Sequence, residues 1–268
     1  MQKKVKQHYD KTAGKEWDRL FQDQYHNIEF FVTTQYLTNY LPKRGRILDA
    51  GGGPGRYTIH LARRDYKMTL LDISSEELKI AEKQIQKQKL EKQVDDIIEG
   101  TITDLSNFQD NYFDAVICLG GPLSHLVKLA EREKAVRELT RVAKIKAPIF
   151  FSVMSRYGVL PRVIKFVPQD ASVLPKYFRD GNHPHPESGV FTYTHFFTID
   201  ELHNLIKKNN LSIIKTVAIE GIASNLKNEV NKMPKKLYRK WLAVFAKLSN
   251  ESSIVGISEH FMVISKKI

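Results

Sequence analysis

The sequence predicts an α/β fold with a parallel sheet, and two observations lead to this prediction. Short apolar runs that read as buried strands alternate with stretches of helical period from about residue 46 to residue 154. A glycine-rich turn joins the first of these strands to the helix that follows it. Because strands that alternate with helices form a parallel sheet through right-handed crossovers, we expect a parallel sheet covered by helices.

The expected elements follow from apolar periodicity and from turn and cap signals. Ser74-x-x-Glu77 is a capping box that begins the second crossover helix, and Thr198 to Glu201 mark the start of a late helix. Strands are expected near 46–50, 67–72, 95–99, 113–119, 148–154, 211–219 and 260–265. Helices are expected near 16–40, 55–64, after Ser74, at 130–144, after Asp200 and within 222–248.

Composition limits the class of protein. The chain has 268 residues, of which 42% are hydrophobic and 10% aromatic, as in soluble globular domains. No apolar run is long enough to span a bilayer, and no hydrophobic signal core follows the N-terminal lysines. Cys118 is the single cysteine, which excludes an intrachain disulfide and a cysteine-based zinc cluster. We therefore expect a cytoplasmic protein without a membrane partner.

The net charge of +12 is the feature that could indicate an anionic partner. Such an excess of Lys and Arg supports binding to nucleic acid, to anionic membranes or to acidic substrates. Its two local runs, 83–92 and 227–240, have helical spacing and are typical of solvated helix faces. The charge alone therefore does not predict a nucleic-acid partner, and we regard nucleic acid as possible but disfavoured.

The glycine-rich turn predicts a nucleoside-containing cofactor. Gly51, Gly53 and Gly55 separate an apolar strand from a helix, so backbone N–H groups can approach a ligand closely. Asp72 ends the next apolar run, where a carboxylate can accept both hydroxyls of a ribose. The dinucleotide pattern G-x-G-x-x-G fails because residue 56 is Arg, and no G-K-[ST] phosphate loop is present. Two alternatives to this interpretation remain. The glycines could form an ordinary tight turn without a ligand, or the protein could be a nicotinamide or flavin enzyme.

The run Asp49-x-Gly51-x-Gly53-x-Gly55 resembles motif I of the class I S-adenosylmethionine-dependent methyltransferases. Asp72 matches the ribose-binding acid of that family, and 100–105 and 113–121 resemble the segments at its third and fourth strands. Tyr9-Asp10 is similar to a Tyr-Asp pattern found ahead of the first strand in many small-molecule members. The resemblance spans about residues 5–154. It implies a Rossmann-like, doubly wound seven-stranded sheet with the last strand antiparallel.

The resemblance also implies the cofactor, S-adenosyl-L-methionine, and its product, S-adenosyl-L-homocysteine. Adenine recognition is expected at Asp104 and the Ile102 backbone, because Thr101 stands where relatives often carry Asp. The cofactor-binding residues that we predict share positions at the carboxyl ends of the first four strands. They are Asp49, Gly51, Gly53, Gly55, Asp72, Ile73, Ile102, Thr103, Asp104 and Leu119.

Substrate determinants are expected outside the cofactor motifs. The segment 120–125 after the fourth strand lacks the [ND]-P-P-[YF] of adenine and glutamine amino methyltransferases, and Cys118 is not preceded by the proline of cytosine-C5 enzymes. His125 is a candidate general base, or else a cap or packing residue of the next helix. Tyr9 is a candidate to close over the cofactor, or to pack an N-terminal helix.

Residues 155–197 interrupt the alternation with five prolines and three glycines, which predicts a functional insertion or lid. Three of its residues, His183, His185 and Glu187, with His195 further on, could suggest a metal site. Prolines at 184 and 186 favour a solvated turn instead, and we predict no metal. The aromatic-rich set could line an apolar pocket or pack the lid onto the sheet. It comprises Tyr177, Phe178, Phe191, Tyr193, His195, Phe196 and Phe197.

The sequence therefore predicts a helical cover at 1–45 and a class I methyltransferase domain at 46–268, with a lid insertion at about 155–197. The predicted function is S-adenosylmethionine-dependent methyl transfer to a small-molecule acceptor, by a monomer or homodimer. The alternatives are an RNA methyltransferase, favoured by the basic surface, and a non-catalytic S-adenosylmethionine-binding protein.

Overall fold

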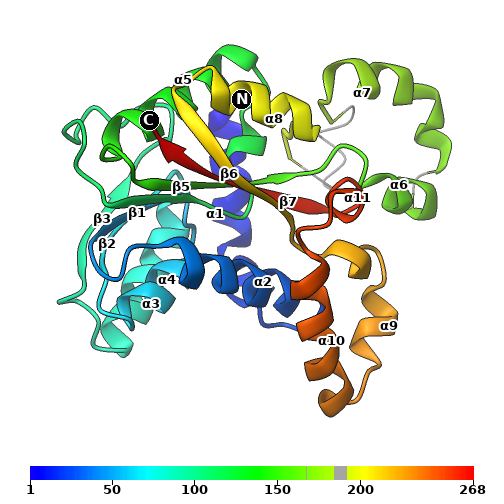
Figure 1. The fold of residues 1–268 in the computed structure, drawn as a ribbon, viewed down its shortest axis with the longest axis horizontal. Coiled ribbons are helices and arrows are strands. Elements are labelled where there is room, and N and C mark those ends of the chain that lie inside the picture. The colour runs from blue at the N-terminus through cyan, green and yellow to red at the C-terminus, as the bar shows by residue number, and fades with distance from the viewer. Residues whose placement is uncertain (167, 184–191) are drawn as a thin grey trace.

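A seven-stranded sheet forms the centre of the molecule (Figure 1). The structure is a computed structural model that describes residues 1–166, 168–183 and 192–268. The strand order is β3-β2-β1-β4-β5-β7-β6. The strands are β1 (Arg46–Ala50), β2 (Lys67–Asp72), β3 (Val94–Glu99), β4 (Ala115–Cys118), β5 (Pro148–Met154), β6 (Leu211–Ala218) and β7 (His260–Lys267).

Strand direction confirms the predicted fold class. Strands β1 to β5 pair in parallel, with the strand order reversing between β1 and β4. Strand β7 is antiparallel to both of its neighbours, β5 and β6. The sheet is therefore doubly wound with an antiparallel last strand, and ligands of such sheets bind beyond the carboxyl ends of the strands, where the order reverses.

Helices cover both faces of the sheet, because the parallel strands are apolar on both sides. On one face, α5 (Leu129–Val142) and α8 (Ile199–Lys207) pack in a core with Phe113, Phe151 and Phe261. On the other, α3 (Arg56–Ala62), α4 (Ser75–Lys87) and α2 (Gln24–Tyr40) pack on β1 and β2. The Ser74 hydroxyl accepts a hydrogen bond from the Glu77 amide, so the predicted cap is confirmed.

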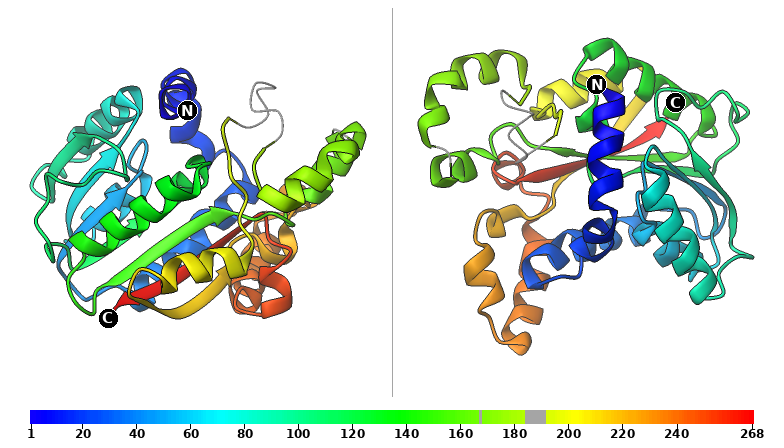
Figure 2. Two further views of the ribbon diagram at one scale, coloured as in Figure 1. Left: turned by 90° about the horizontal axis from the view of Figure 1, so that it is seen from above. Right: turned by 180° about the vertical axis from the view of Figure 1, so that it is seen from behind.

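The N-terminal region consists of two helices, whereas one helix was predicted for 16–40. Helix α1 covers Gln2–Arg19 and α2 begins at Gln24. The Asp23 carboxylate accepts from the amide of His26, and this cap starts a new helix at a break that apolar periodicity does not reveal. Figure 2 shows α1 crossing in front of the sheet, over the region where the parallel strands end. The division at residue 45 stays a prediction.

Two segments project from the central body (Figure 1). Within 155–197 lie α6 (Leu160–Phe166), the 3-10 helix η2 (Pro168–Val173) and α7 (Leu174–Asp180). A small cluster of Val159, Tyr177 and Phe196 packs with the first residues of α6 and α7. The second segment holds α9 (Lys227–Asn231) and α10 (Lys235–Leu248); α11 (Ser252–Val255) then leads into β7. Among the described residues, no helix has the length and apolar character needed to cross a membrane.

Candidate cofactor and acceptor site

The loop between β1 and α3 requires glycine for two separate reasons. Gly51, Gly53 and Gly55 all have positive φ, at 79°, 53° and 78°. In addition, a Cβ on Gly51 would lie 2.4 Å from Cγ of Pro122, a rigid side chain of the segment after β4. The loop therefore runs close to the end of β4 and leaves its backbone open to a ligand.

Asp72 at the end of β2 is held by this loop. Its carboxylate accepts hydrogen bonds of 2.8 Å from the amides of Gly53 and Ser74. Asp49 lies beneath the loop and away from the ligand side, where its Oδ2 accepts from the hydroxyl of Thr58 at 2.7 Å. Burial raises the pKa of Asp49 to about 7. Asp72 thus lines the cavity at this edge of the sheet, while the buried Asp49 does not.

A cavity of about 810 Å³ opens beyond the carboxyl ends of the strands. Most of the predicted site residues line it: Gly51, Gly53, Asp72, Ile73, Ile102, Leu119, Tyr9 and His125. Asp49, Gly55, Thr103 and Asp104 do not. A Cβ on Gly55 would lie 3.1 Å from the Cβ of Ala81, so this glycine serves the packing of α3 on α4.

The structure corrects the position expected for Asp104. This residue is exposed, its carboxylate accepts from the amide of Ser106, and these hydrogen bonds lower its pKa. Thr101 lines the cavity instead, and its hydroxyl lies 3.0 Å from that of Thr103. The turn at 101–104 therefore directs Thr101 and Ile102, and not the acid, toward the cavity.

The structure brings the two predicted catalytic residues, Tyr9 and His125, together. Oη of Tyr9 lies 2.7 Å from Nε2 of His125, and Nδ1 of His125 lies 3.0 Å from the carbonyl oxygen of Tyr193. A carbonyl can only accept, so Nδ1 carries the proton and Nε2 accepts from the Tyr9 hydroxyl. Burial lowers the pKa of His125 to about 4. His125 is therefore neutral and ties α1 to the segment after β4 and to the insertion.

This burial predicts a loss of stability in acid. Between about pH 6.5 and pH 4 the unfolded chain protonates His125 while the folded protein does not, so stability falls as pH falls. The expected contribution is about 2 kcal/mol at pH 5. Urea unfolding at pH 7 and pH 5 should show that His125→Asn loses less stability on acidification than the unsubstituted protein. The pKa of His60 is also lowered to about 4, but its contribution to the acid dependence of stability is the same in both proteins. An unchanged acid dependence would contradict the neutral buried state.

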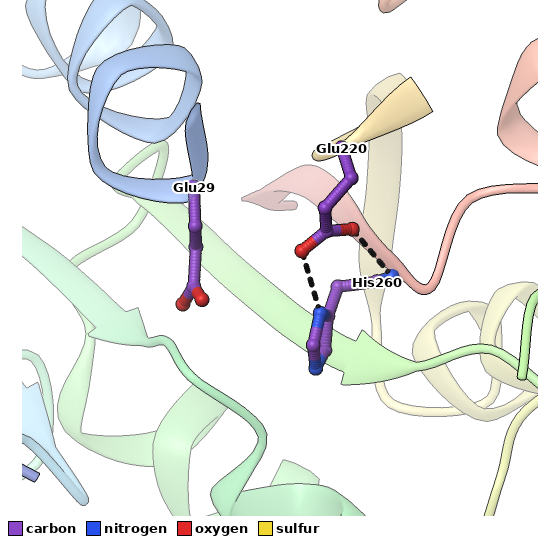
Figure 3. Close-up of side chains that lie close together, drawn as sticks. All are labelled: Glu29, Glu220 and His260. Carbon is purple, nitrogen blue, oxygen red and sulfur yellow. Dashed lines mark hydrogen bonds and ion pairs between the residues drawn. The ribbon is translucent and has the colours of Figure 1, made fainter. Parts of the chain in front are cut away.

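Six residues that sequence reasoning did not select line the far part of the cavity. Arg19 of α1 pairs with Glu29 of α2, with Nη1 and Oε2 2.6 Å apart. Glu220 and His260 form a second pair, with Oε1 and Nδ1 2.7 Å apart (Figure 3). The hydroxyl of Tyr25 donates to the carboxylate of Glu259. These residues come from both ends of the chain, and no local sequence motif links them.

Neither histidine cluster is arranged as a free set of metal ligands. Glu29, Glu220 and His260 each have one possible ligand atom within 4.8 Å of the other two. However, the Glu29 carboxylate is already paired with Arg19, and the Glu220 carboxylate with His260. In the insertion, His195 lies 2.7 Å from the carboxylate of Glu201, in a network with Arg132 and Arg156. His185 and Glu187 lie outside the described residues. We assign no metal to either cluster.

Three aromatic residues of the insertion, Tyr177, Phe196 and Phe197, are packed in hydrophobic clusters. Tyr177 and Phe196 form the small cluster beside Val159, and Phe197 belongs to the main core. Phe178 is largely exposed, and Phe191 lies outside the described residues. None of the described members lines the cavity, where the insertion contributes Arg162, Lys165, Phe166 and Thr192. Of the two interpretations of this set, packing is the one observed.

Comparisons with known proteins agree with this geometry. Residues 47–146 match a family model described as "Methyltransferase domain". YqeM of Bacillus subtilis (strain 168), whose name assigns it to the methyltransferases, is 27% identical over 126 residues. These cover 47% of this chain and 49% of YqeM, so the chain spans about half the length of that relative. The family match and the relative therefore support the methyltransferase resemblance that the sequence predicts, over the segment that holds the glycine-rich loop and Asp72.

Solved structures share the fold at low sequence identity. An S-adenosylmethionine-dependent methyltransferase from Methanosarcina mazei is 22% identical, with a TM-score of 0.62 over 87% of this chain and 97% of that one. Geranyl diphosphate C-methyltransferase from Streptomyces coelicolor A3(2), solved with S-adenosyl-L-homocysteine, is 11% identical, with a TM-score of 0.56 over 88% and 75%. These likenesses concern the fold.

Proposed function

We propose that the protein transfers a methyl group from S-adenosyl-L-methionine to a small-molecule acceptor. The observation that carries this proposal is one continuous cavity, which runs from the Gly51–Gly53 loop to His260 under helix α1. Its volume of about 810 Å³ lies in the upper part of the range for ligand pockets, as expected for a cofactor together with a small acceptor.

The cavity residues fit the cofactor. The Asp72 carboxylate would accept from the ribose hydroxyls, and the positive-φ loop at Gly51 and Gly53 would lie against the methionine part. Ile73, Ile102 and Leu119 supply apolar contacts. The bound cofactor supplies an electrophilic methyl group, and the protein aligns the acceptor and excludes water. In this proposal Tyr9 and His125 hold α1 over the site.

The helix that crosses over the site favours a small acceptor over RNA. Helix α1 lies across the strand ends, and its Tyr9 is hydrogen-bonded to His125 beneath it. The local basic runs at 83–92 and 227–240 lie on and after α4 and on α9 and α10, and of these only residues 227 and 228 line the cavity.

A labelled-transfer experiment tests the proposal. Methyl-tritiated S-adenosylmethionine is incubated with the protein and, in parallel, with a metabolite extract or with total RNA. We expect protein-dependent label in the metabolite arm and little in RNA. Label mainly in RNA would contradict the small-molecule acceptor, and label in neither arm despite cofactor binding would contradict methyl transfer.

A further inference from the structure

We infer that His260, oriented by Glu220, is the base that removes the acceptor's proton, and that the acceptor is an amine bound as an ammonium. This inference rests on the proposed methyl transfer and deepens it by naming a catalytic residue and a substrate class.

Strand direction brings both residues to the edge where the cofactor motifs lie. His260 is the first residue of β7, which runs antiparallel to β5, so its start lies at the carboxyl end of β5 and pairs with Met154. Glu220 follows the end of β6 at the same edge. Neighbouring strands are about 4.8 Å apart, which places His260 about 10 Å along the sheet from β4. Met154, Glu220 and His260 all line the cavity.

The Glu220 carboxylate holds the imidazole in one orientation. Its Oε1 lies 2.7 Å from Nδ1 of His260, while its Oε2 accepts from the backbone amide of His260 at 2.8 Å and from the hydroxyl of Ser258 at 3.2 Å. Nδ1 must then donate to the carboxylate, which leaves Nε2 as the atom that can accept a proton. In the described part of the chain Nε2 has no hydrogen-bond partner, and the side chain keeps 24% of its surface exposed.

Figure 3 shows one ring nitrogen of His260 joined to the Glu220 carboxylate and the other on the far side of the ring from that carboxylate. His125 differs in this respect, because its Nε2 already accepts from the Tyr9 hydroxyl. Of these two cavity histidines, His260 is therefore the one whose accepting nitrogen is free.

The charges around His260 favour a cationic acceptor. Three carboxylates act on the ring: Glu220 after the end of β6, Glu29 of α2, and Glu259, which directly precedes His260 in the chain. They raise the pKa of His260 to about 9. Arg19 pairs with Glu29 and, with a smaller contribution from His26, lowers the pKa of Glu29 against the effect of burial. Burial and Glu220 raise the pKa of Glu259, although Arg162 acts in the opposite direction and the Glu259 carboxylate accepts from Tyr25. When His260 is neutral, Glu220 loses the one ion-pair partner that it has among the described residues. An ammonium restores the balance and brings the proton that His260 can accept.

The proposed step is balanced in atoms and electrons. His260 Nε2 takes one proton from the bound ammonium, which exposes the nitrogen lone pair. That pair forms the new nitrogen–carbon bond as the carbon–sulfur bond of the methyl donor breaks, and the electrons of the broken bond stay on sulfur. The proton on His260 then passes to water in the cavity. No oxidant, reductant or metal is needed.

The first test combines product charge with the pH profile. A metabolite extract is labelled with methyl-tritiated S-adenosylmethionine and separated on a cation exchanger at pH 7, where a methylated amine is retained. We expect the protein-dependent label in the retained fraction. Initial rates with that fraction should rise about tenfold per pH unit between pH 6 and pH 8, because only neutral His260 accepts a proton.

Three variants distinguish a base from a structural residue. His260→Gln should be at least about 100-fold slower at pH 8 with a flat profile, while its S-adenosyl-L-homocysteine affinity stays within about threefold. Glu220→Gln should move the rising limb at least about one pH unit lower, because it removes a charge that stabilises the imidazolium. His203→Gln, a histidine bonded to Thr216 and away from the cavity, should match the unsubstituted protein.

Carbon NMR of histidine-labelled protein tests the pair without any acceptor. The ring of His260, assigned with His260→Gln, should titrate above pH 8, and its midpoint should be at least about one pH unit lower in Glu220→Gln. Titration near pH 6.5 in both proteins would overturn the assignment of the base. Label confined to neutral or anionic products would overturn the amine, and label in no fraction at all would instead contradict the proposed methyl transfer.

Discussion

Asp72→Ala should weaken S-adenosyl-L-homocysteine binding roughly tenfold to a hundredfold in calorimetric titration. The carboxylate lines the cavity at the end of β2 and is held by the amides of Gly53 and Ser74. Loss of a charge-assisted hydrogen bond costs about 1.5–3 kcal/mol, and two ribose hydroxyls would lose the same acceptor. The substitution also removes the acceptor that orders Gly53, so we expect a loss of affinity closer to a hundredfold than to tenfold.

Asp104→Ala is the matched control for this experiment. It removes the same charge from an aspartate after β3 that is exposed and does not line the cavity. Its affinity for S-adenosyl-L-homocysteine should stay within about twofold. Equal losses in both variants would indicate a nonspecific effect of charge and contradict the ribose role of Asp72.

Replacing residues 160–190 with a short glycine-serine linker should abolish methyl transfer and leave S-adenosyl-L-homocysteine affinity within a few-fold. The described part of this segment packs through its own small cluster and not through the main core. Its Arg162, Lys165 and Phe166 line the cavity, and their removal would open the site to water. The anchor of the segment remains, because Arg156 keeps its hydrogen bond to the Phe196 carbonyl and its pair with Glu201.

Two point variants separate the cavity wall from the outer face of α6. Phe166→Ala should slow transfer, whereas Ile164→Ala, at a side chain that is 71% exposed and does not line the cavity, should leave the rate unchanged. Loss of cofactor binding in a linker variant that still unfolds cooperatively would show that the segment belongs to the cofactor site.

Local patterns made the cofactor half of the site predictable from the sequence. Gly51, Gly53 and Asp72 lie within one strand–helix–strand unit, so their spacing alone places them around one ligand. Asp104 was predicted at the cavity and lies outside it, because the Thr101–Thr103 contact and the Ser106 amide set the course of that turn. Such side-chain to backbone competition has no periodic signal.

The acceptor half could not be predicted in the same way. Arg19, Glu29, Glu220 and His260 meet only after α1 has crossed the strand ends and β7 has inserted beside β5. These residues are separated by up to about 240 positions in the sequence, and no motif has such a spacing. Taken singly, each residue has the sequence context of an ordinary surface or core residue. His125 was selected as a base for its place after β4, but its pairing with Tyr9 depends on the same crossing helix.

Calorimetric titration of the full chain with S-adenosyl-L-homocysteine and, separately, with NAD tests the central claim most directly. The Gly51–Gly53 loop and Asp72 predict micromolar binding of S-adenosyl-L-homocysteine and no binding of NAD, because the glycine spacing lacks the pattern of a dinucleotide fold. Binding of NAD without binding of S-adenosyl-L-homocysteine would contradict the account.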